Sequence, residues 1–242
     1  GSIAAVQANT QGQLEVLASS AEIGQGKNTV FTEIVTQALP LMPQDICIIN
    51  PDTHLVPDSG PTVASRTSMV VGKLIESAAI GLRQRLCAEG YLDAIDLSRE
   101  KLLAALKKAA QDYALKNKKF RVDTQYKQPP NVHWNDQKYQ GDAYATYAWA
   151  IYVAEVSVDT VTYETKCDQF YALQEVGKVL HPILAAGQIE GGVAQAIGWA
   201  LYEKVVMKNG IMINNQMTNY IMPTASDVPE IRVDFEERNQ HY

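Results

Sequence analysis

Two glutamines flanked by glycines are the residues of this chain best suited to bind a polar ligand. Gln25 lies in segment 22–26, and Gln195 follows Gly191 and Gly192. A neutral amide both donates and accepts hydrogen bonds, and neighbouring glycines let the backbone approach a flat molecule closely. We expect each glutamine to lie where a strand gives way to a helix, so that free backbone N–H groups face the ligand. Two such junctions suggest one ligand held from two sides.

Three hydroxyl side chains lie near the start of a predicted helix. Thr62, Ser65 and Thr67 lie just before a long amphipathic pattern. Hydroxyls and free amides at the start of a helix can hold a phosphate without lysine.

The three cysteines are widely separated and form no Cys-x-x-Cys pair, and the histidines are scattered. This spacing argues against a self-contained zinc or iron–sulfur site and fits a reducing compartment.

The elements that must position these residues alternate between strand and helix. Segment 14–19 reads as a strand that leads into the first glycine loop, and 46–49 reads as a buried strand. Apolar residues at helical spacing predict helices from Val30 to Leu39, from Val70 to Leu86, and after a cap at Ser98. The second half repeats the layout, with a strand pair over 150–158 and 160–173, a glycine loop, and a helix carrying Ile189 to Val205.

We therefore expect an α+β fold of two strand–glycine loop–helix subdomains around a ligand cleft. The first subdomain covers residues 1–125 and the second covers 144–242. Between them, segment 126–143 is polar and interrupted by two prolines, which is typical of a connecting surface loop.

Composition excludes several classes of function. With 46% hydrophobic residues the chain can build a real core, and a net charge of −6 argues against a nucleic-acid partner. No apolar run approaches the length of a membrane span, and the first residues do not resemble a signal peptide. We expect a cytoplasmic protein with neither a membrane nor a nucleic acid as partner.

Each motif also has a plain structural interpretation. Gly24 and Gly26 could serve only turn geometry, Ser65 and Thr67 could be ordinary helix caps, and Gly191 with Gly192 could allow close helix packing. A nucleotide loop fits poorly, because Asn28 stands where the metal-binding Ser or Thr should follow Lys27. No Gly-x-Ser-x-Gly nucleophile elbow is present.

Four blocks taken together resemble the molybdenum-cofactor-binding large subunit of the xanthine dehydrogenase and aldehyde oxidase family. They are EIGQG at 22–26, DTHLVPDSGPTVASR at 52–66, GQIEGGVAQ at 187–195 and YIMPTASDVP at 220–229. The blocks follow the family order and are spread over nearly the whole chain. Their combination is a specific signal, whereas a single glycine loop would not be.

The resemblance implies a molybdenum–molybdopterin cofactor, either plain or as the cytosine dinucleotide. The dithiolene of the cofactor holds the metal, so no side chain of this chain is expected to ligate it directly. Gln25 and Gln195 match glutamines beside the pterin, and the hydroxyl residues match a segment that binds its phosphate and pterin. The implied cofactor-binding residues are Gly24, Gln25, Gly26, Thr62, Ala64, Ser65, Thr67 and Gln195.

The chain also departs from the family pattern. Family members carry a Gly-Glu-Pro segment after the last block, whose glutamate is the general base, and this sequence ends before it. We therefore expect no catalytic residue in this chain, which alone would be inactive. Residues 160–163 lack the usual Thr-Gly turn, and Glu175 and His181 replace the commoner Asp and Asn.

The resemblance implies part of a molybdenum hydroxylase that oxidises a purine, an N-heterocycle or an aldehyde with oxygen derived from water. Its implied partners are the small-molecule substrate, the other half of the molybdenum domain, and domains or subunits that carry iron–sulfur clusters and FAD. The alternative is a non-catalytic cofactor-binding or assembly module with the same fold.

Overall fold

The computed structural model describes residues 1–95, 97–135, 137–144 and 146–237. They form two compact units, Gly1–Ala143 and Tyr144–Tyr242, each with its own sheet and helices. Among the described helices, none combines the length and the apolar composition that crossing a membrane requires.

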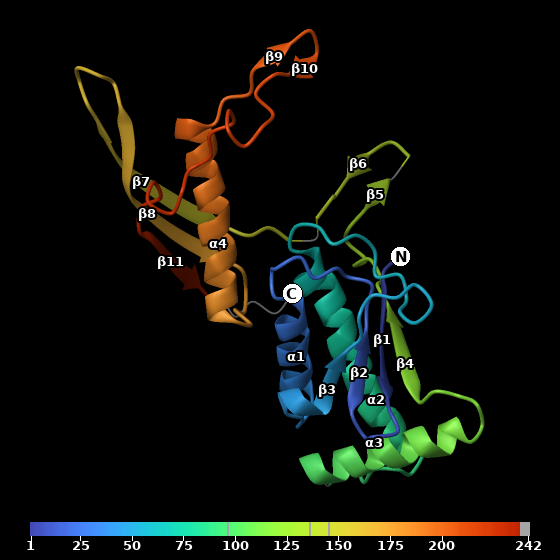
Figure 1. Ribbon diagram of the computed structural model, residues 1–242. Coiled ribbons are helices and arrows are strands. Elements are labelled where there is room, and N and C mark those ends of the chain that lie inside the picture. The colour runs from blue at the N-terminus through green and yellow to red at the C-terminus, as the bar shows by residue number, and fades with distance from the viewer. Residues whose placement is uncertain (96, 136, 145, 238–242) are drawn as a thin grey trace. The chain divides into compact units, whose positions relative to one another are not determined.

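The first unit is built on a four-stranded mixed sheet (Figure 1). Strand β1 is antiparallel to β2 and β4, and β2 is parallel to β3, which gives the order β3-β2-β1-β4. The strands are β1 Ile3–Ala8, β2 Leu14–Leu17, β3 Ile46–Ile48 and β4 Arg121–Gln125. Strand β1 is almost completely buried, as expected for a central strand covered on both faces.

Helices cover one face of this sheet. Helices α1 (Lys27–Ala38) and α2 (Gly72–Ala88) lie side by side, and α3 (Arg99–Ala114) packs against α2 and β1 (Figure 1). A 3₁₀ turn η1 (Pro43–Asp45) follows α1, and a π turn η2 (Thr67–Val71) runs directly into α2. The helical spacing brings the apolar side chains inward, and those with the largest buried volume include Phe31, Val35, Ile75, Leu82, Leu86, Leu102 and Leu106.

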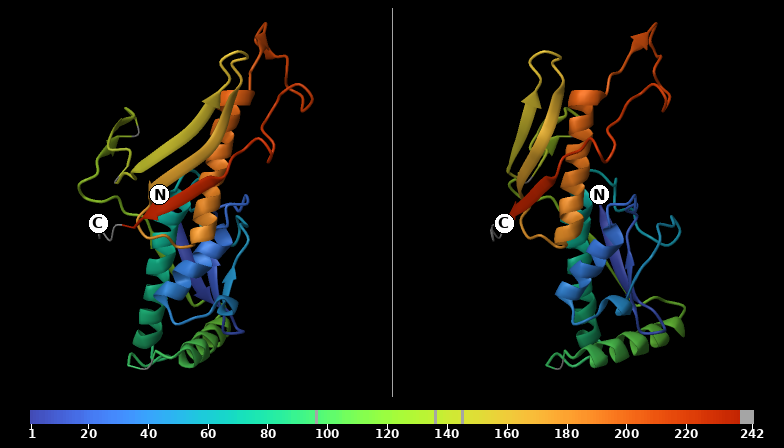
Figure 2. Two further views of the ribbon diagram at one scale, coloured as in Figure 1. Left: turned by 90° about the vertical axis from the view of Figure 1, so that its left-hand side faces the viewer. Right: turned by 60° about the vertical axis from the view of Figure 1, so that its left-hand side comes forward.

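The second unit is a three-stranded sheet with one long helix against it. Strands β7 (Ala150–Val158) and β8 (Thr165–Glu175) are antiparallel, and β11 (Ile231–Glu236) is parallel to β8, in the order β11-β8-β7. The two views of Figure 2 both place helix α4 (Pro182–Ile197) along one face of the sheet. Its core consists of Cys167, Val193 and Ile197, packed with partly buried residues such as Phe170 and Ile231.

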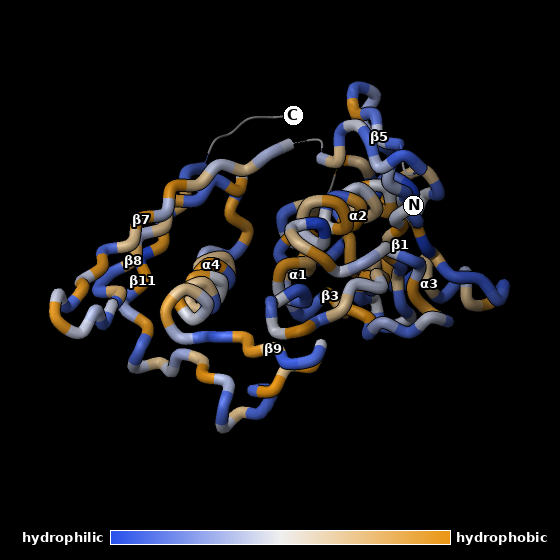
Figure 3. The backbone as a smooth tube through the Cα atoms, turned by 90° about the horizontal axis from the view of Figure 1, so that it is seen from above, coloured by the Kyte–Doolittle hydropathy of each residue, from blue (hydrophilic) through white to orange (hydrophobic). Residues whose placement is uncertain are grey.

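Strand β7 is exposed along its whole length within this unit. In Figure 3, hydrophobic and hydrophilic stretches alternate along β7 and β8. Because directly paired residues share a face, Ile151 and Leu173 lie together on the side away from α4, as do Val153 and Tyr171. All four side chains are more than a third exposed.

The polar segment 126–143 belongs to the first compact unit and carries a short hairpin. Its two strands, β5 (Trp134–Asn135) and β6 (Gln140–Gly141), are only two residues long. Most side chains of the segment are exposed.

The mixed fold is the expected one, but the prediction of a second glycine loop is wrong. Gly191 and Gly192 lie inside α4, and Gln195 lies in its last turn instead of ahead of a helix. Each helical glycine costs about 1 kcal/mol relative to alanine, and packing of the buried row Val193–Ile197 on the sheet offsets that cost. A π turn η3 (Gly198–Tyr202) then ends the helix ahead of Val205, before the short hairpin of β9 (Met207–Lys208) and β10 (Ile211–Met212).

Helix α4 begins at a side-chain cap that the sequence analysis did not foresee. The Nδ1 atom of His181 accepts a hydrogen bond from the backbone N–H of Leu184 at 3.2 Å, and Pro182 occupies the first helical position. An asparagine cap would bond the same region of the helix. His181 therefore fills the role of the commoner asparagine.

The turn between β7 and β8 shows how the chain manages without a glycine. Strand β8 begins at Thr165, later than predicted, because residues 159–164 form the turn. The Asp159 carboxylate accepts bonds from the N–H groups of Val161 and Thr162 at 2.7 and 2.8 Å, and these bonds lower its pKa. Tyr163 then adopts a φ of 59°, a left-handed conformation that favours glycine.

We predict that Tyr163→Gly stabilises the protein by about 0.5–1 kcal/mol, because glycine adopts positive φ without steric cost. Tyr163 is largely exposed, so little packing is lost. The measurement is the free energy of unfolding by urea denaturation. Tyr163→Ala is the matched control, since it removes the same side chain but keeps the strain. Equal effects of the two substitutions would contradict the conformational explanation.

Candidate functional site

The Gly-Gln-Gly loop, defined here as residues 20–26, is held in shape by its own glutamine. The Oε1 atom of Gln25 accepts a bond from the N–H of Ile23 at 2.7 Å, and its Nε2 atom donates to the carbonyl of Ala21 at 2.9 Å. An amide oxygen has two lone pairs and an NH2 group has two hydrogens, so one acceptor and one donor remain available. Gly24 and Gly26 have φ values of 104° and 83°, which explains why glycine stands at both positions.

The Glu22 carboxylate accepts hydrogen bonds from backbone N–H groups at and just before the start of α1. Its Oε1 atom accepts from the N–H groups of Gly24 at 3.1 Å and Gly26 at 3.0 Å, and its Oε2 atom accepts from Asn28 at 3.0 Å. Desolvation raises the pKa of the Glu22 carboxyl, but these three bonds and the charge of Lys27 outweigh it, so the net pKa is lowered. A carboxylate at a helix N-terminus is favoured by both the free amides and the helix dipole.

The hydroxyl segment, defined here as residues 59–67, lies directly beside this loop. Ser19 and Ser59 exchange two hydrogen bonds, of 3.0 and 2.8 Å, through their hydroxyls and backbone N–H groups. The Thr62 hydroxyl accepts a bond from the N–H of Ala21 at 2.9 Å. Two of the predicted binding segments, separated by about forty residues in the sequence, are therefore adjacent in the first unit.

Arg66 fixes the path of the hydroxyl segment. Its guanidinium group donates to the carbonyls of Ser59 at 2.8 Å and Pro61 at 3.1 Å and also bonds the Ser2 hydroxyl on the edge of β1. A side chain at Gly60 would collide with this guanidinium group. Ala64 has a φ of 44°, a strained conformation for a residue with a Cβ atom.

The remaining predicted hydroxyls differ in exposure. Ser65 is exposed, and its hydroxyl has no hydrogen bond to any residue that the structure describes. Thr67 is buried at the first position of η2, and its Oγ1 atom has no partner among the described residues. The same holds for the buried Oγ atom of Ser20, at the base of the Gly-Gln-Gly loop. Buried hydroxyls without a partner are uncommon and call for an explanation.

Gln195 lies in the other unit, on an exposed face of α4. Gln188 and Gly191 lie on the same face, since residues three and four apart are neighbours on a helix. A side chain added at Gly191 or Gly192 would meet no atom within 4 Å. The π turn η3 begins three residues after Gln195, just as η2 begins at Thr67. π turns inside helices are frequent at functional sites.

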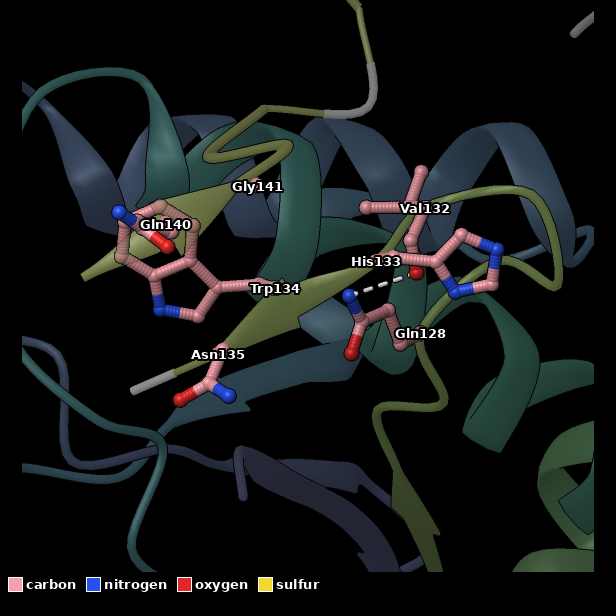
Figure 4. A pocket seen from close by; sticks show the side chains of 7 residues that line it. All are labelled: Gln128, Val132, His133, Trp134, Asn135, Gln140 and Gly141. Atoms are coloured by element: carbon pink, nitrogen blue, oxygen red, sulfur yellow. Dashed lines mark hydrogen bonds between the residues drawn. The ribbon is translucent and has the colours of Figure 1, made fainter. Parts of the chain in front are cut away.

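A cavity of about 430 Å³ lies elsewhere, on the β5–β6 hairpin. Figure 4 shows its lining, in which the Gln128 amide donates to the carbonyl of Val132 beside His133, Trp134 and Gln140. None of the predicted binding residues lines it. In residues 1–95, 97–135, 137–144 and 146–237, no three His, Cys, Asp or Glu side chains converge so as to hold a metal ion.

Three residues that shape the site, namely Glu22, Lys27 and Arg66, are not among the predicted binding residues. Lys27 could have been found, because it precedes Phe31 and Val35 by four and eight residues and so lies on the apolar face of α1. Glu22 and Arg66 were part of the quoted motifs. Only the folded backbone reveals which N–H and C=O groups they bond.

Residues 1–229 match the model of the molybdopterin cofactor-binding domain. The chain is 27% identical over 239 residues to the xanthine dehydrogenase molybdenum-binding subunit of Escherichia coli O157:H7, covering 96% of the chain and 32% of that protein. It is 28% identical to the carbon monoxide dehydrogenase large chain of Hydrogenophaga pseudoflava, covering 87% of the chain and 27% of the relative. The chain thus spans about a third or less of these relatives.

Solved structures agree with the fold. The aldehyde oxidoreductase of Desulfovibrio desulfuricans superposes with a TM-score of 0.76 at 25% identity, over 98% of this chain and 24% of that one. Quinoline 2-oxidoreductase from Pseudomonas putida 86 gives a TM-score of 0.76 at 24% identity, over 98% of this chain and 31% of that one. The expected mixed α/β architecture is confirmed.

We predict that Glu22→Ala lowers the free energy of unfolding by about 1 kcal/mol, the usual cost of losing a helix cap. Glu22→Gln keeps an acceptor but loses the charge, so it should cost less. The measurement is denaturant unfolding as a function of pH.

The sign of the pH dependence follows from the lowered pKa. The stabilisation by Glu22 is complete above the carboxyl's ordinary pKa of 4.5 and is lost as the pH falls through the lower folded-state value. The wild-type protein and Glu22→Gln should therefore converge at acid pH. A difference that persists unchanged there would contradict the role of the carboxylate charge.

Proposed function

Because the chain belongs to the molybdopterin cofactor-binding domain family, we propose that it is part of a molybdenum hydroxylase and supplies part of the cofactor pocket of that enzyme. The observation that carries the proposal is the junction of the Gly-Gln-Gly loop with the hydroxyl segment in one unit. The substrate class is a purine, an N-heterocycle or an aldehyde. The relatives are named for xanthine, carbon monoxide, quinoline and aldehydes.

The first unit fits a flat, anionic cofactor. The space beside Gly24 is open, and Gln25 keeps one free donor and one free acceptor. Ile23 and Val63 are exposed on the two adjacent segments and can cover the apolar faces of a ring system. The buried hydroxyls of Ser20 and Thr67 lack partners, which is the state expected where a polar ligand completes a site.

The residues proposed to bind the cofactor are those of the loop, of the hydroxyl segment and of α4. Gly24 and Gly26 give the backbone access, and Gln25 bonds the pterin edge. Thr62, Ala64, Ser65 and Thr67 form the strained segment that faces the phosphate or the pterin. Gln195 adds a second amide from the exposed face of α4.

The cofactor, when bound, supplies the redox chemistry and the oxygen transfer, as is general for cofactor enzymes. The chain's own residues bind and orient it. Glu22 holds the N–H groups of Gly24 and Gly26 in place, and Arg66 fixes the backbone of the hydroxyl segment through its hydrogen bond to the carbonyl of Ser59. Fixed dipoles of this kind need no reorganisation when charge moves during a reaction. We assign no general base within the chain.

The proposal includes partners that complete the enzyme. The apolar side chains of Ile151 and Val153 are exposed together on the sheet face away from α4 and fit burial by the remainder of the molybdenum domain. Electrons from the substrate need an exit, so we include iron–sulfur and FAD domains or subunits in the proposed assembly. The cofactor is molybdopterin, plain or as a cytosine dinucleotide.

The test is the molybdenum and pterin content of the complete subunit that contains this chain. We expect Gln195→Ala to lower both contents several-fold without changing the melting temperature of the cofactor-free protein, because Gln195 is exposed and has no partner in the described residues. Gln188→Ala, on the same helix face, is the matched control and should change them less. Full occupancy in Gln195→Ala would overturn the assignment of this side chain.

The molybdenum and pterin contents of the wild-type protein test whether it is part of a molybdenum hydroxylase. Stoichiometric molybdenum and pterin would support a hydroxylase and justify a screen of N-heterocycles and aldehydes. A folded, complete assembly that contains neither would contradict the proposed function and favour a non-catalytic assembly module.

A further inference from the structure

Lys27 is a buried positive charge with very few partners. It is only 3% exposed, although lysine is rarely buried unless paired. Its Nζ atom donates one hydrogen bond, to the carbonyl of Ser20 at 3.0 Å, and lies 5.7 Å from the centre of the Phe31 ring. An ammonium group has three donors. Among the described residues it makes no other hydrogen bond and no ion pair.

This charge is costly for the fold. Lys27 shares the buried face of α1 with Phe31 and Val35, where an apolar side chain of similar length would fill the same space. Burial lowers the pKa of the Lys27 ammonium, and the attraction of Glu22 only partly opposes this. A lysine also opposes the positive end of the helix dipole at the first position of a helix. A buried charge without a close counterion is destabilising.

The position of the charge relates it to the proposed binding loop. Lys27 directly follows Gly26, and its ammonium group bonds Ser20, so the charge lies at the base of the loop that carries Gln25. The groups facing it are the Ser20 carbonyl, the Phe31 ring and, at longer range, the Glu22 carboxylate. Glu22 is exposed, and solvent screens its charge more than that of the buried ammonium.

We propose that the buried ammonium group of Lys27 provides the countercharge for the anionic cofactor at the Gly-Gln-Gly loop. The inference rests on the proposed function and adds the residue that supplies the electrostatic attraction. Its field acts through a poorly screened interior, where a single charge has a longer reach than in water. The same charge therefore destabilises the cofactor-free protein and strengthens binding of the cofactor.

The test measures how one substitution changes two quantities, the melting temperature of the cofactor-free protein and the dissociation constant for the cofactor. A merely structural role and an electrostatic role predict different directions for these changes. In the complete subunit, Lys27→Met removes the charge and keeps the length and apolar stem of the side chain. We expect the melting temperature of the cofactor-free protein to stay equal or rise, by about 2 °C. We expect the dissociation constant for isolated molybdopterin to rise by about tenfold.

Two further variants complete the experiment. Lys27→Gln keeps an N–H donor without the charge and should weaken cofactor binding as Lys27→Met does. Lys73→Met is the matched control, since Lys73 is an exposed lysine paired with Glu76 on α2, and it should change neither quantity.

Three outcomes would overturn the inference. The first is a cofactor-free Lys27→Met protein that melts well below the wild type, which would show that the hydrogen bond to Ser20 stabilises the fold. The second is an unchanged dissociation constant in Lys27→Met, and the third is wild-type binding by Lys27→Gln. If the wild-type subunit itself binds no molybdopterin, the proposed function fails, and the inference fails with it.

Discussion

The backbone N–H groups of residues 19–28 have no strand to pair with, and the site depends on how they are satisfied. Side chains bond six of these groups in turn. Ser59 bonds Ser19, Thr62 bonds Ala21, Gln25 bonds Ile23, and Glu22 bonds Gly24, Gly26 and Asn28. Ala21, Ile23 and Gly24 are exposed, so water could bond their N–H groups, but the side-chain bonds give these groups fixed positions. The loop can thus stay open without the support of a sheet.

The same constraint links segments that are far apart in the sequence. Two of these six bonds are accepted by the hydroxyl segment, whose own path depends on the three oxygens that Arg66 bonds. The Ser59 hydroxyl also donates to the carbonyl of Ile3 on β1, so the network is anchored to the central strand. Loop, hydroxyl segment and sheet therefore form one connected hydrogen-bonded structure. A ligand that bonds the loop would be held by the core of the unit.

The sequence predicted the three helices of the first unit and its strands β2 and β3, because their apolar residues recur at a clear period, but it did not predict the central strand β1 or the edge strand β4. Phe31 and Val35 mark the buried face of α1, and Leu82 and Leu86 mark that of α2. Prediction failed where tertiary packing overrides local preference. Gly191 and Gly192 favour a loop by propensity, yet Val193 and Ile197 hold them in a helix through contacts with β8.

The candidate site was predictable only in part, because its hydrogen bonds join segments that are far apart in the sequence. Residue types identified Gln25 and Thr62, but no pattern could show that Thr62 bonds the backbone of the glycine loop. The roles of Glu22 and Arg66 depend on where distant N–H and C=O groups come to lie. Tyr163 illustrates the limit well, since its left-handed conformation is imposed by the turn that Asp159 organises and is unfavourable for tyrosine itself.

The π turns at η2 and η3 have a geometric consequence for the helices that they join. Each accommodates one residue more than a regular α-helical turn, and one residue corresponds to a rotation of about 100° around the helix axis. Thr67 at the start of η2 is therefore rotated from the direction it would have on a continuous α2, and Tyr202 at the end of η3 is likewise rotated relative to α4. In this way a helix whose buried face is fixed by the core can present its terminal side chains in a direction that a continuous α-helix would not allow.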